Sequence, residues 1–182
     1  MKKSIFRSNK KFFHLSLDYQ TQPLLAHLDW LFLQKKVGEL SIKFEVEVQA
    51  LVMMDTHVHL LGASFGPNEN FFCDDLQHAI LYTRKGDNLS EPILNYSQYL
   101  NTYKYIYRNP VEAGLCLRAE DYIYSSLRSL LGMAALSCDI HDQLGLIQNP
   151  LQILRWLNQN IDYKVSQMKL LREKPQQLQT KS

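Results

Sequence analysis

The chain has 182 residues, a hydrophobic content of 46% and a formal net charge of only +2. This length allows one domain with a well-filled core, and it excludes an eight-fold β/α barrel, which typically needs about 250 residues. The composition is typical of a globular protein and excludes a disordered chain, whereas the charge is lower than that of many dedicated duplex-DNA binders.

The cysteines and the apolar segments indicate where the protein works. Cys73, Cys116 and Cys138 are far apart and have no Cys-X-X-Cys spacing, so neither a disulfide framework nor a zinc site is predicted. Free thiols fit a reducing cytosol. Asp18 and Gln20 interrupt the N-terminal apolar residues before they reach the length of a signal peptide. No segment approaches the ~20 consecutive apolar residues of a transmembrane helix, so we expect a cytoplasmic protein.

The first elements in chain order are a strand and a helix. Residues 12–18 alternate between apolar and polar side chains, which predicts a strand with its apolar side chains on one face. Pro23 then opens an apolar run with helical spacing. Lys35, Lys36 and Gly38 are C-terminal signals, so we expect this helix to end near them.

A strand hairpin is expected next. Residues 42–48 alternate between apolar and charged side chains, the pattern of a half-buried antiparallel strand, and apolar residues continue to Met54. The pair Asp55-Thr56 suits a turn, and residues 57–63 return as a second strand.

The middle of the chain predicts a helix at about residues 71–83 and a short strand near residues 92–94. Asn95 is a suitable N-cap for a long helix that follows. Pro110 disfavours helical geometry at the residue before it, so we expect the long helix to end at Asn109.

The C-terminal part predicts two further helices. One is short and lies around residues 125–127, and the other is capped by Asn149-Pro150 and runs over about residues 151–158. The polar tail from Pro175 is expected to be frayed.

The order of the elements indicates the fold class. Strand, helix, strand, strand, helix and strand in succession predict an α+β fold of ferredoxin-like type, with an antiparallel sheet, helices on one face and additional C-terminal helices. We expect residues 1–135 to form the main domain and residues 136–182 to form a helical C-terminal appendage.

The long helix has two distinct sides. Its apolar stripe, which we expect to face the core, consists of Tyr96, Tyr99, Leu100, Tyr103 and Tyr107. Tyr105 lies off this stripe, on the polar side with Thr102 and Asn109. Core packing therefore does not explain this tyrosine.

Two short motifs carry the candidate chemistry. His57 and His59 are two residues apart on a strand, so both imidazoles point to one face, an arrangement that suits a metal ion. Tyr105 and Asn109 are four apart on a helix, so the phenol and the amide share a face. If these faces meet, a divalent cation lies beside a phenolic nucleophile that can cut a phosphodiester. Each motif also has an ordinary reading, since strand histidines are often surface residues and Asn-Pro opens many turns.

The same residues resemble a known family. The segment MMDTHVHLL at residues 53–61 resembles the strand motif of single-tyrosine HUH transposases, in which U is a bulky apolar residue. The segment YKYIYRNPVEAGL at residues 103–115 closely resembles the helix end of the REP-associated tyrosine transposases, and residues 121–126 resemble its continuation. The similar part spans roughly residues 10–130, in the same order.

The resemblance implies a ferredoxin-like fold that uses Mg²⁺ or Mn²⁺. Carried over by position, His57 and His59 would be metal ligands, Tyr105 the nucleophile and Asn109 a third metal contact. The implied reaction is cleavage and rejoining of single-stranded DNA through a covalent 5′-phosphotyrosine, in DNA transposition or REP-element processing. The partner would be single-stranded DNA next to a hairpin, bound by a monomer or a homodimer.

Four basic residues are candidates for DNA phosphate contacts. Lys104 and Arg108 flank Tyr105 on the long helix, and Lys10 and Lys11 belong to an N-terminal basic cluster. Ordinary solvated charges explain Lys104 and Arg108 equally well, and they are the default explanation of the N-terminal cluster.

Three other functions fit parts of the pattern. The DTHVHL segment also looks like the first-strand metal motif of amidohydrolases, but the chain is too short for their barrel, and only His78 and His141 follow. The histidine-triad hydrolases need a third alternating histidine where this chain has Leu61. A catalytically inactive DNA-binding remnant of the transposase fold stays open, because the charge is low and the segment between the histidines and Tyr105 is short.

Overall fold

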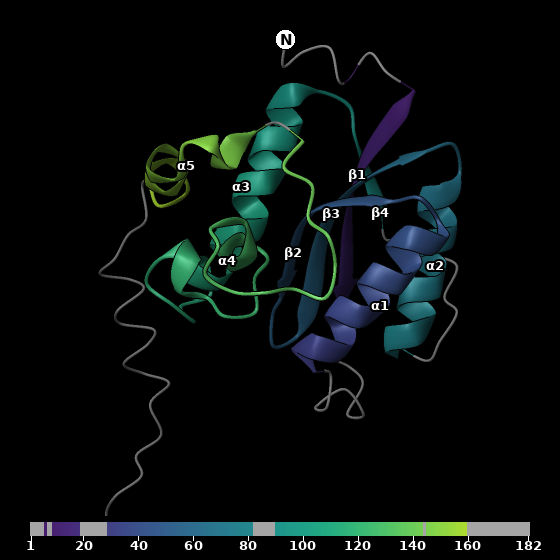
Figure 1. Cartoon of the computed structure of the whole chain (residues 1–182), viewed down its shortest axis with the longest axis horizontal. Helices are drawn as coiled ribbons and strands as arrows, with labels where there is room; N and C mark the ends of the chain where they lie inside the picture. Colours follow the sequence, from purple (N-terminus) through teal and green to yellow (C-terminus); the bar gives the residue numbers. More distant parts are fainter. Residues whose placement is uncertain (1–5, 7–8, 19–28, 82–89, 144, 160–182) are drawn as a thin grey trace, which may run out of the picture.

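A four-stranded antiparallel sheet with the strand order β2-β3-β1-β4 forms the centre of the protein (Figure 1). The computed structural model describes residues 6, 9–18, 29–81, 90–143 and 145–159. The strands are β1 (Lys10–Asp18), β2 (Glu47–Met53), β3 (His57–Phe65) and β4 (Ser90–Ile93). Helix α1 (Trp30–Lys43) connects β1 to β2, and helix α2 (Asn68–Leu81) connects β3 to β4. This order confirms the expected ferredoxin-like α+β fold.

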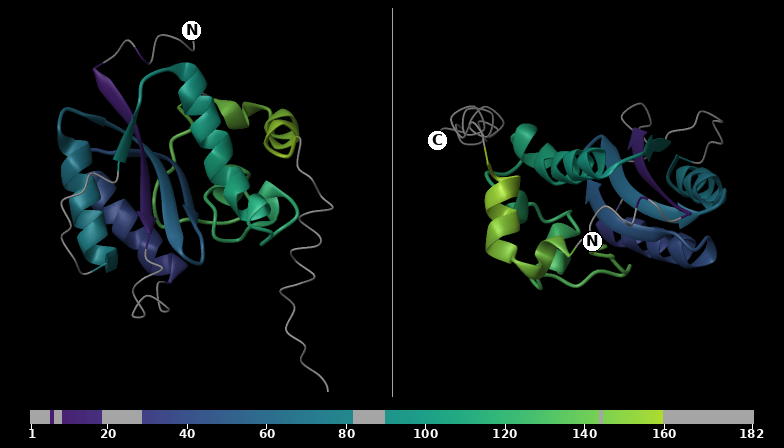
Figure 2. Two further views of the ribbon diagram at one scale, coloured as in Figure 1. Left: turned by 180° about the vertical axis from the view of Figure 1, so that it is seen from behind. Right: turned by 90° about the horizontal axis from the view of Figure 1, so that it is seen from above.

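The two faces of the sheet are covered by different helices. Helices α1 and α2 pack on one face, against alternate side chains of the strands such as Leu15 and Leu60. Helix α3 (Tyr96–Glu112) covers the other face, where Phe12 and Leu61 are buried. The view from above shows the sheet between these two layers (Figure 2). Strand alternation therefore sends neighbouring residues of β1 and β3 into separate environments.

The segment after α3 folds back along the free edge of the sheet. It contains the short helices η3 (Ala119–Asp121), α4 (Leu127–Leu130), η4 (Leu146–Gln148) and α5 (Pro150–Leu157). Ser126 fastens this segment to β2, because its amide donates to the Leu51 carbonyl at 2.8 Å and its hydroxyl accepts from the Leu51 amide at 2.9 Å. The edge strand β2 is thereby covered, which protects it from pairing with other chains.

Helix α1 ends later, and strand β2 begins later, than the sequence predicts. The expected helix start at Pro23 lies outside the described residues, but the helix continues past Gly38 to Lys43. The predicted strand over residues 42–48 is therefore wrong over residues 42–46, and β2 begins at Glu47. Gly38 is buried against Ser137 and Cys138, so this glycine permits close packing and does not end the helix.

Helix α3 also continues beyond its predicted end. Pro110 lies inside the helix, which runs to Glu112 and is closed by Gly114 with a φ of 80°. The Gly114 amide donates to the Val111 carbonyl and the Leu115 amide to the Pro110 carbonyl, which is a Schellman motif. Proline lacks the amide donor and crowds the carbonyl one turn earlier, but its ring is buried here. Burial and the glycine cap therefore override the local preference at Asn109.

Other boundaries agree with the sequence. The hairpin turns at residues 54–56, and the Asn95 side chain caps α3 by accepting from the Gln98 amide at 2.9 Å. Asn149 caps α5 in the same way. None of the described helices is long and apolar enough to span a membrane.

The division into residues 1–135 and 136–182 stays a prediction. Cys138 packs in the core beneath α1, and Ile153 and Leu157 pack in the core beneath α3. The expected frayed tail from Pro175 lies outside the described residues.

Gly38→Ala tests the close packing of α1. A Cβ at this position would lie 2.9 Å from the Ser137 carbonyl oxygen, a backbone atom that cannot easily move. We expect a loss of about 1–3 kcal/mol in the free energy of unfolding, because overpacking outweighs the better helix propensity of alanine. Urea denaturation measures it. Lys35→Ala, on the exposed side of the same helix, should change stability by less than about 0.5 kcal/mol; an equal effect of both substitutions would contradict this account.

Candidate active site

The two histidines of β3 lie side by side on the face that α3 covers. Their ring centroids are 4.6 Å apart, with an angle of 74° between the ring planes. His59 is 3% exposed, whereas His57, at the start of the strand, is half-buried. The Thr56 hydroxyl lies 2.8 Å from His57 Nδ1, and the Nε2 atom of that ring has no hydrogen-bond partner among the described residues.

Asn109 reaches His59 from α3. Its Nδ2 atom lies 2.8 Å from His59 Nε2. An amide nitrogen can only donate, so His59 Nε2 accepts and its proton is on Nδ1. The structure thus brings together the strand motif and the helix motif, 50 residues apart in the chain.

A third imidazole, which the sequence analysis missed, completes the cluster. His14 on β1 has its Nε2 atom 3.2 Å from His59 Nδ1, and the two rings stack with centroids 5.2 Å apart. With the proton on Nδ1, His59 donates to His14. The alternation of β1 already indicates that His14 and Ser16 lie on the face opposite Leu15. Only the pairing of Ser16 with His59 shows that this face is the one that carries the β3 histidines.

Tyr105 stands at the open side of this cluster. Its side chain is 45% exposed, although it is a large aromatic residue. The ring centroid lies 5.2 Å from that of His59 and 6.0 Å from that of His14, in edge-on orientations. The phenol is therefore both accessible to a substrate and adjacent to the imidazoles.

The other tyrosines along α3 are in a different situation. Tyr99, Tyr103 and Tyr107 are almost completely buried, and burial raises the pKa of each phenol above its usual value. Tyr99 donates to the Gln49 side chain, and Tyr107 shares a hydrogen bond with the Ser126 hydroxyl. A phenol must lose its proton to attack phosphorus, so these three are poor nucleophiles.

Burial keeps the imidazoles neutral. Burial, with His57 and His14 nearby, lowers the pKa of His59 to about 3. Burial also lowers the pKa values of His57 and His14. The nearby carboxylates of Asp18 and Glu91, respectively, raise these pKa values and offset part of the effect. Neutral rings have a free nitrogen lone pair, the form that binds metal ions.

An open cavity of about 450 Å³ lies in front of the cluster. Its lining consists of His14, Ser16, His59, Glu91, Asn101, Thr102 and Tyr105. Hydroxyl, amide and imidazole groups dominate this surface, so the cavity can hold a polar ligand against the phenol.

The four candidate cations differ in their surroundings. Lys104 and Arg108 lie on α3 near Tyr105, but Arg108 pairs with Glu112 at 3.2 Å. Lys10 forms an ion pair with Glu47 at 2.6 Å. Lys10 lies four residues before His14 on β1, which separates the two residues by about 13 Å along the strand. Lys11 is exposed, and strand alternation places it on the face opposite His14. Both α3 cations contact the C-terminal segment, since Lys104 Nζ lies 5.2 Å from the centroid of the Trp156 ring and Arg108 donates to the Gln159 carbonyl oxygen at 3.4 Å.

The low pKa of His59 predicts a pH dependence of stability. Its pKa in the unfolded chain is about 6.5. As pH falls from that value towards 3, the unfolded chain binds protons that the folded protein does not, so stability falls. His57 and His14 act in the same direction.

Two measurements check this pH dependence on chelator-treated protein. Urea denaturation should give a lower free energy of unfolding at pH 5 than at pH 7.5. Nitrogen-15 NMR of the imidazoles should show His59 still neutral at pH 5 with its proton on Nδ1. A charged His59 ring at that pH would contradict the arrangement.

Comparisons with known proteins give one informative result. No protein-family model matches the chain, and no curated protein matches it. Among solved structures, a REP-associated tyrosine transposase bound to a REP hairpin is similar, with a TM-score of 0.52 and 19% sequence identity. The similarity covers 74% of this chain and 87% of that one. The chain therefore shares its α+β fold with a REP-associated tyrosine transposase.

Proposed function

We propose that the protein cleaves and rejoins single-stranded DNA through a covalent bond between Tyr105 and a 5′-phosphate. The carrying observation is the exposed phenol of Tyr105 beside neutral imidazoles and Asn109 at the wall of an open cavity. The fold shared with a transposase that was solved with a DNA hairpin supports the same reaction class.

The reaction is a transesterification that conserves the phosphodiester energy. The phenolic oxygen of Tyr105, having lost its proton, forms a bond to phosphorus. The bond from phosphorus to the 3′ oxygen breaks, and that oxygen leaves as a 3′-hydroxyl after it takes up a proton. A 3′-hydroxyl of another strand can reverse the step, so rejoining needs no ATP.

The residues of the cluster fit a divalent cation. His57 Nε2 has no hydrogen-bond partner among the described residues, and His59 Nε2 accepts from the Asn109 amide, a hydrogen bond that a metal ion would have to replace. In the described part of the chain, no group of three His, Cys, Asp or Glu side chains could hold a metal ion. The ligand set would therefore be His57, His59 and the Asn109 amide, which leaves positions for substrate oxygens and water. Bound there, Mg²⁺ or Mn²⁺ would polarise the scissile phosphate and stabilise developing charge.

His14 has the position of an orienting residue. It accepts a hydrogen bond from the Nδ1 side of His59, opposite the nitrogen that would bind the metal. Metal-bound histidines usually have such a partner, which fixes the tautomer and the ring orientation. We assign this role to His14.

The substrate we propose is single-stranded DNA beside a hairpin. Phenol, phosphate and metal must come into line, and a flexible strand adopts that geometry at small cost. Lys104 and Arg108 are the candidate phosphate contacts next to Tyr105, and Lys10 and Lys11 are candidates for a more distant part of the DNA. Few free cations predict a shallow salt dependence of binding.

A DNA-binding protein without catalysis is the second candidate. The net charge is low, and Asn109 occupies the lone pair of His59 that a metal would need. The accessibility of Tyr105 favours catalysis, because DNA binding alone does not require this phenol.

Tyr105→Phe tests the nucleophile. It should abolish the covalent protein–DNA adduct, seen as a shifted band with labelled DNA in a denaturing gel, and leave stability and DNA affinity nearly unchanged, since the phenol is exposed. Tyr107→Phe is the matched control, because it should keep the adduct and lose about 1 kcal/mol of stability with its buried hydrogen bond. Adduct formation by Tyr105→Phe would refute the assignment.

His14→Ala tests the orienting role. We expect Mn²⁺ to bind about 10–100-fold more weakly, the usual effect of removing such a partner, as measured by electron paramagnetic resonance titration. His14→Gln can still accept a hydrogen bond and should recover part of the affinity. His57→Ala, which removes a proposed ligand, should weaken Mn²⁺ binding further. Unchanged affinity in His14→Ala would assign this residue a structural role only.

A further inference from the structure

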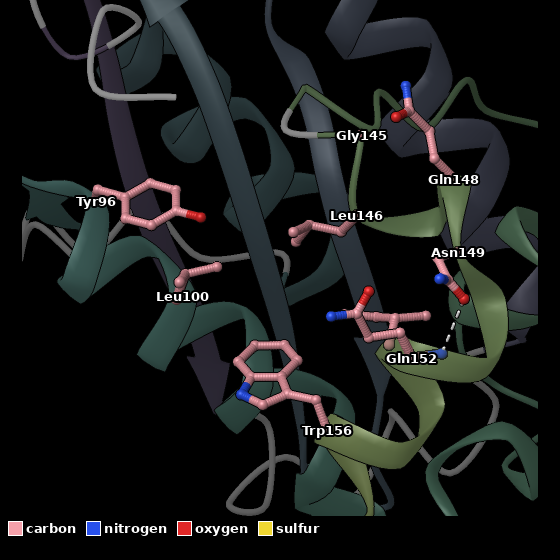
Figure 3. A pocket seen from close by; sticks show the side chains of 9 residues that line it. Tyr96, Leu100, Gly145, Leu146, Gln148, Asn149, Gln152 and Trp156 are labelled. Atoms are coloured by element: carbon pink, nitrogen blue, oxygen red, sulfur yellow. Dashed lines mark hydrogen bonds between the residues drawn. The ribbon is translucent and has the colours of Figure 1, made fainter. Parts of the chain in front are cut away.

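A second pocket lies on the far side of α3 from the imidazoles. It has a volume of about 340 Å³ and opens between α3 and the C-terminal segment (Figure 3). Tyr96 and Leu100 form its α3 wall, and Gln148, Gln152 and Trp156 line it from η4 and α5. The views of the whole chain show α5 beside α3 and away from α1 and α2 (Figure 2).

The pocket combines a flat aromatic surface with neutral polar groups. Trp156 is half-buried, and its ring extends from α5 towards α3, where the Tyr96 hydroxyl points into the same space (Figure 3). The side-chain amides of Gln148 and Gln152 form no hydrogen bond with any other described residue, so both can serve a ligand. None of the residues that line the pocket is charged.

These groups match the chemistry of a nucleobase. Aromatic side chains stack on the flat face of any base, and an amide can both donate to and accept from its edge. A lining without charge does not suit a phosphate or a carboxylate. The volume lies near the lower end of the range for ligand sites, enough for one flat heterocycle.

Lys104 lies between this pocket and Tyr105 of the candidate active site. Lys104 follows Tyr96 and Leu100 on one side of α3, and its Nζ atom lies 5.2 Å from the centroid of the Trp156 ring. Tyr105 is the next residue, 100° further around the helix. A helix with its side chains is only about 10–12 Å across, so a short piece of strand can pass from Tyr105 over Lys104 to Trp156.

We propose that this pocket binds one unpaired base of the single-stranded DNA held at Tyr105, by stacking on Trp156 and hydrogen bonding to Gln148 and Gln152. This rests on the proposed function for the identity of the ligand. Base stacking gives affinity with few cations, in agreement with a chain of net charge +2.

Tryptophan fluorescence tests the proposal without using catalysis. The chain has two tryptophans, Trp30 and Trp156, so Trp30→Phe leaves Trp156 as the single probe. Titration with a hairpin that carries a single-stranded flank, in chelator, should quench this fluorescence in a saturable way. The matched control, Trp156→Phe, reports from Trp30 at the start of α1, which packs on the opposite face of the sheet, and should show no quenching.

Base-specific binding is checked with altered DNA and altered protein. One abasic position in the flank should abolish the quenching and weaken binding about 10-fold, and Trp156→Ala should weaken the binding of intact DNA to a similar extent. Gln148→Ala with Gln152→Ala, both exposed residues, should reduce the preference among the four bases at that position. Equal quenching by intact and abasic flanks, or by a peptide in place of DNA, would overturn the proposal.

The two proposals can fail separately. In Tyr105→Phe, quenching should persist while the covalent adduct is lost. Adduct formation by the natural chain without quenching of Trp156 would overturn the base pocket and keep the catalytic function. Quenching with no adduct in the presence of Mn²⁺ would keep the pocket and assign it to a non-catalytic DNA-binding protein.

Discussion

The antiparallel register between β1 and β3 is the constraint on which the site depends. Ser16 pairs with His59, so His14 and His59 lie on one face with their rings in contact. A slip of one residue between the two strands would place His14 and His59 on opposite faces of the sheet. The register is in turn fixed by the apolar core beneath α1 and α2, because Leu15 and Leu60 are completely buried on the opposite face. Packing on one side of the sheet thus determines chemistry on the other.

Helix α3 places functional side chains on the histidine face of the sheet, because one side of the helix packs in the core and another side faces the imidazoles. Tyr99, Tyr103 and Tyr107 fill the core between α3 and the sheet. The hydrogen bonds from Tyr99 to Gln49 and between Tyr107 and Ser126 fix the rotation of the helix. That rotation directs Tyr105 and Asn109 to the imidazoles. The same rotation directs Tyr96 and Leu100 towards α5. One helix therefore contributes residues to both the imidazole cluster and the aromatic pocket. The low net charge is consistent with DNA held by stacking as well as by cations.

Local sequence signals located most of the elements correctly. The hairpin turn at residues 54–56 and the caps at Asn95 and Asn149 depend on neighbouring residues alone, and all three are present. The same kind of reasoning failed at Gly38 and Pro110. Glycine is typical of a helix end, but Gly38 lies within α1, where it packs closely against residues about 100 positions later in the chain. At Pro110, burial of the ring and the Gly114 cap outweigh one lost hydrogen bond.

The sequence by itself determined the order of the elements, the shared face of His57 and His59, and the position of Tyr105 off the core stripe of α3. These follow from the periods of strands and helices, which are local properties. Only the tertiary structure decided that β1 lies next to β3, and thereby that His14 joins the cluster. Only it placed Trp156 against α3 and buried the imidazoles enough to keep them neutral. The physical reason is that strand pairing, helix docking and burial depend on contacts between residues far apart in the chain. The spacing of residues along the sequence does not indicate which of these contacts form.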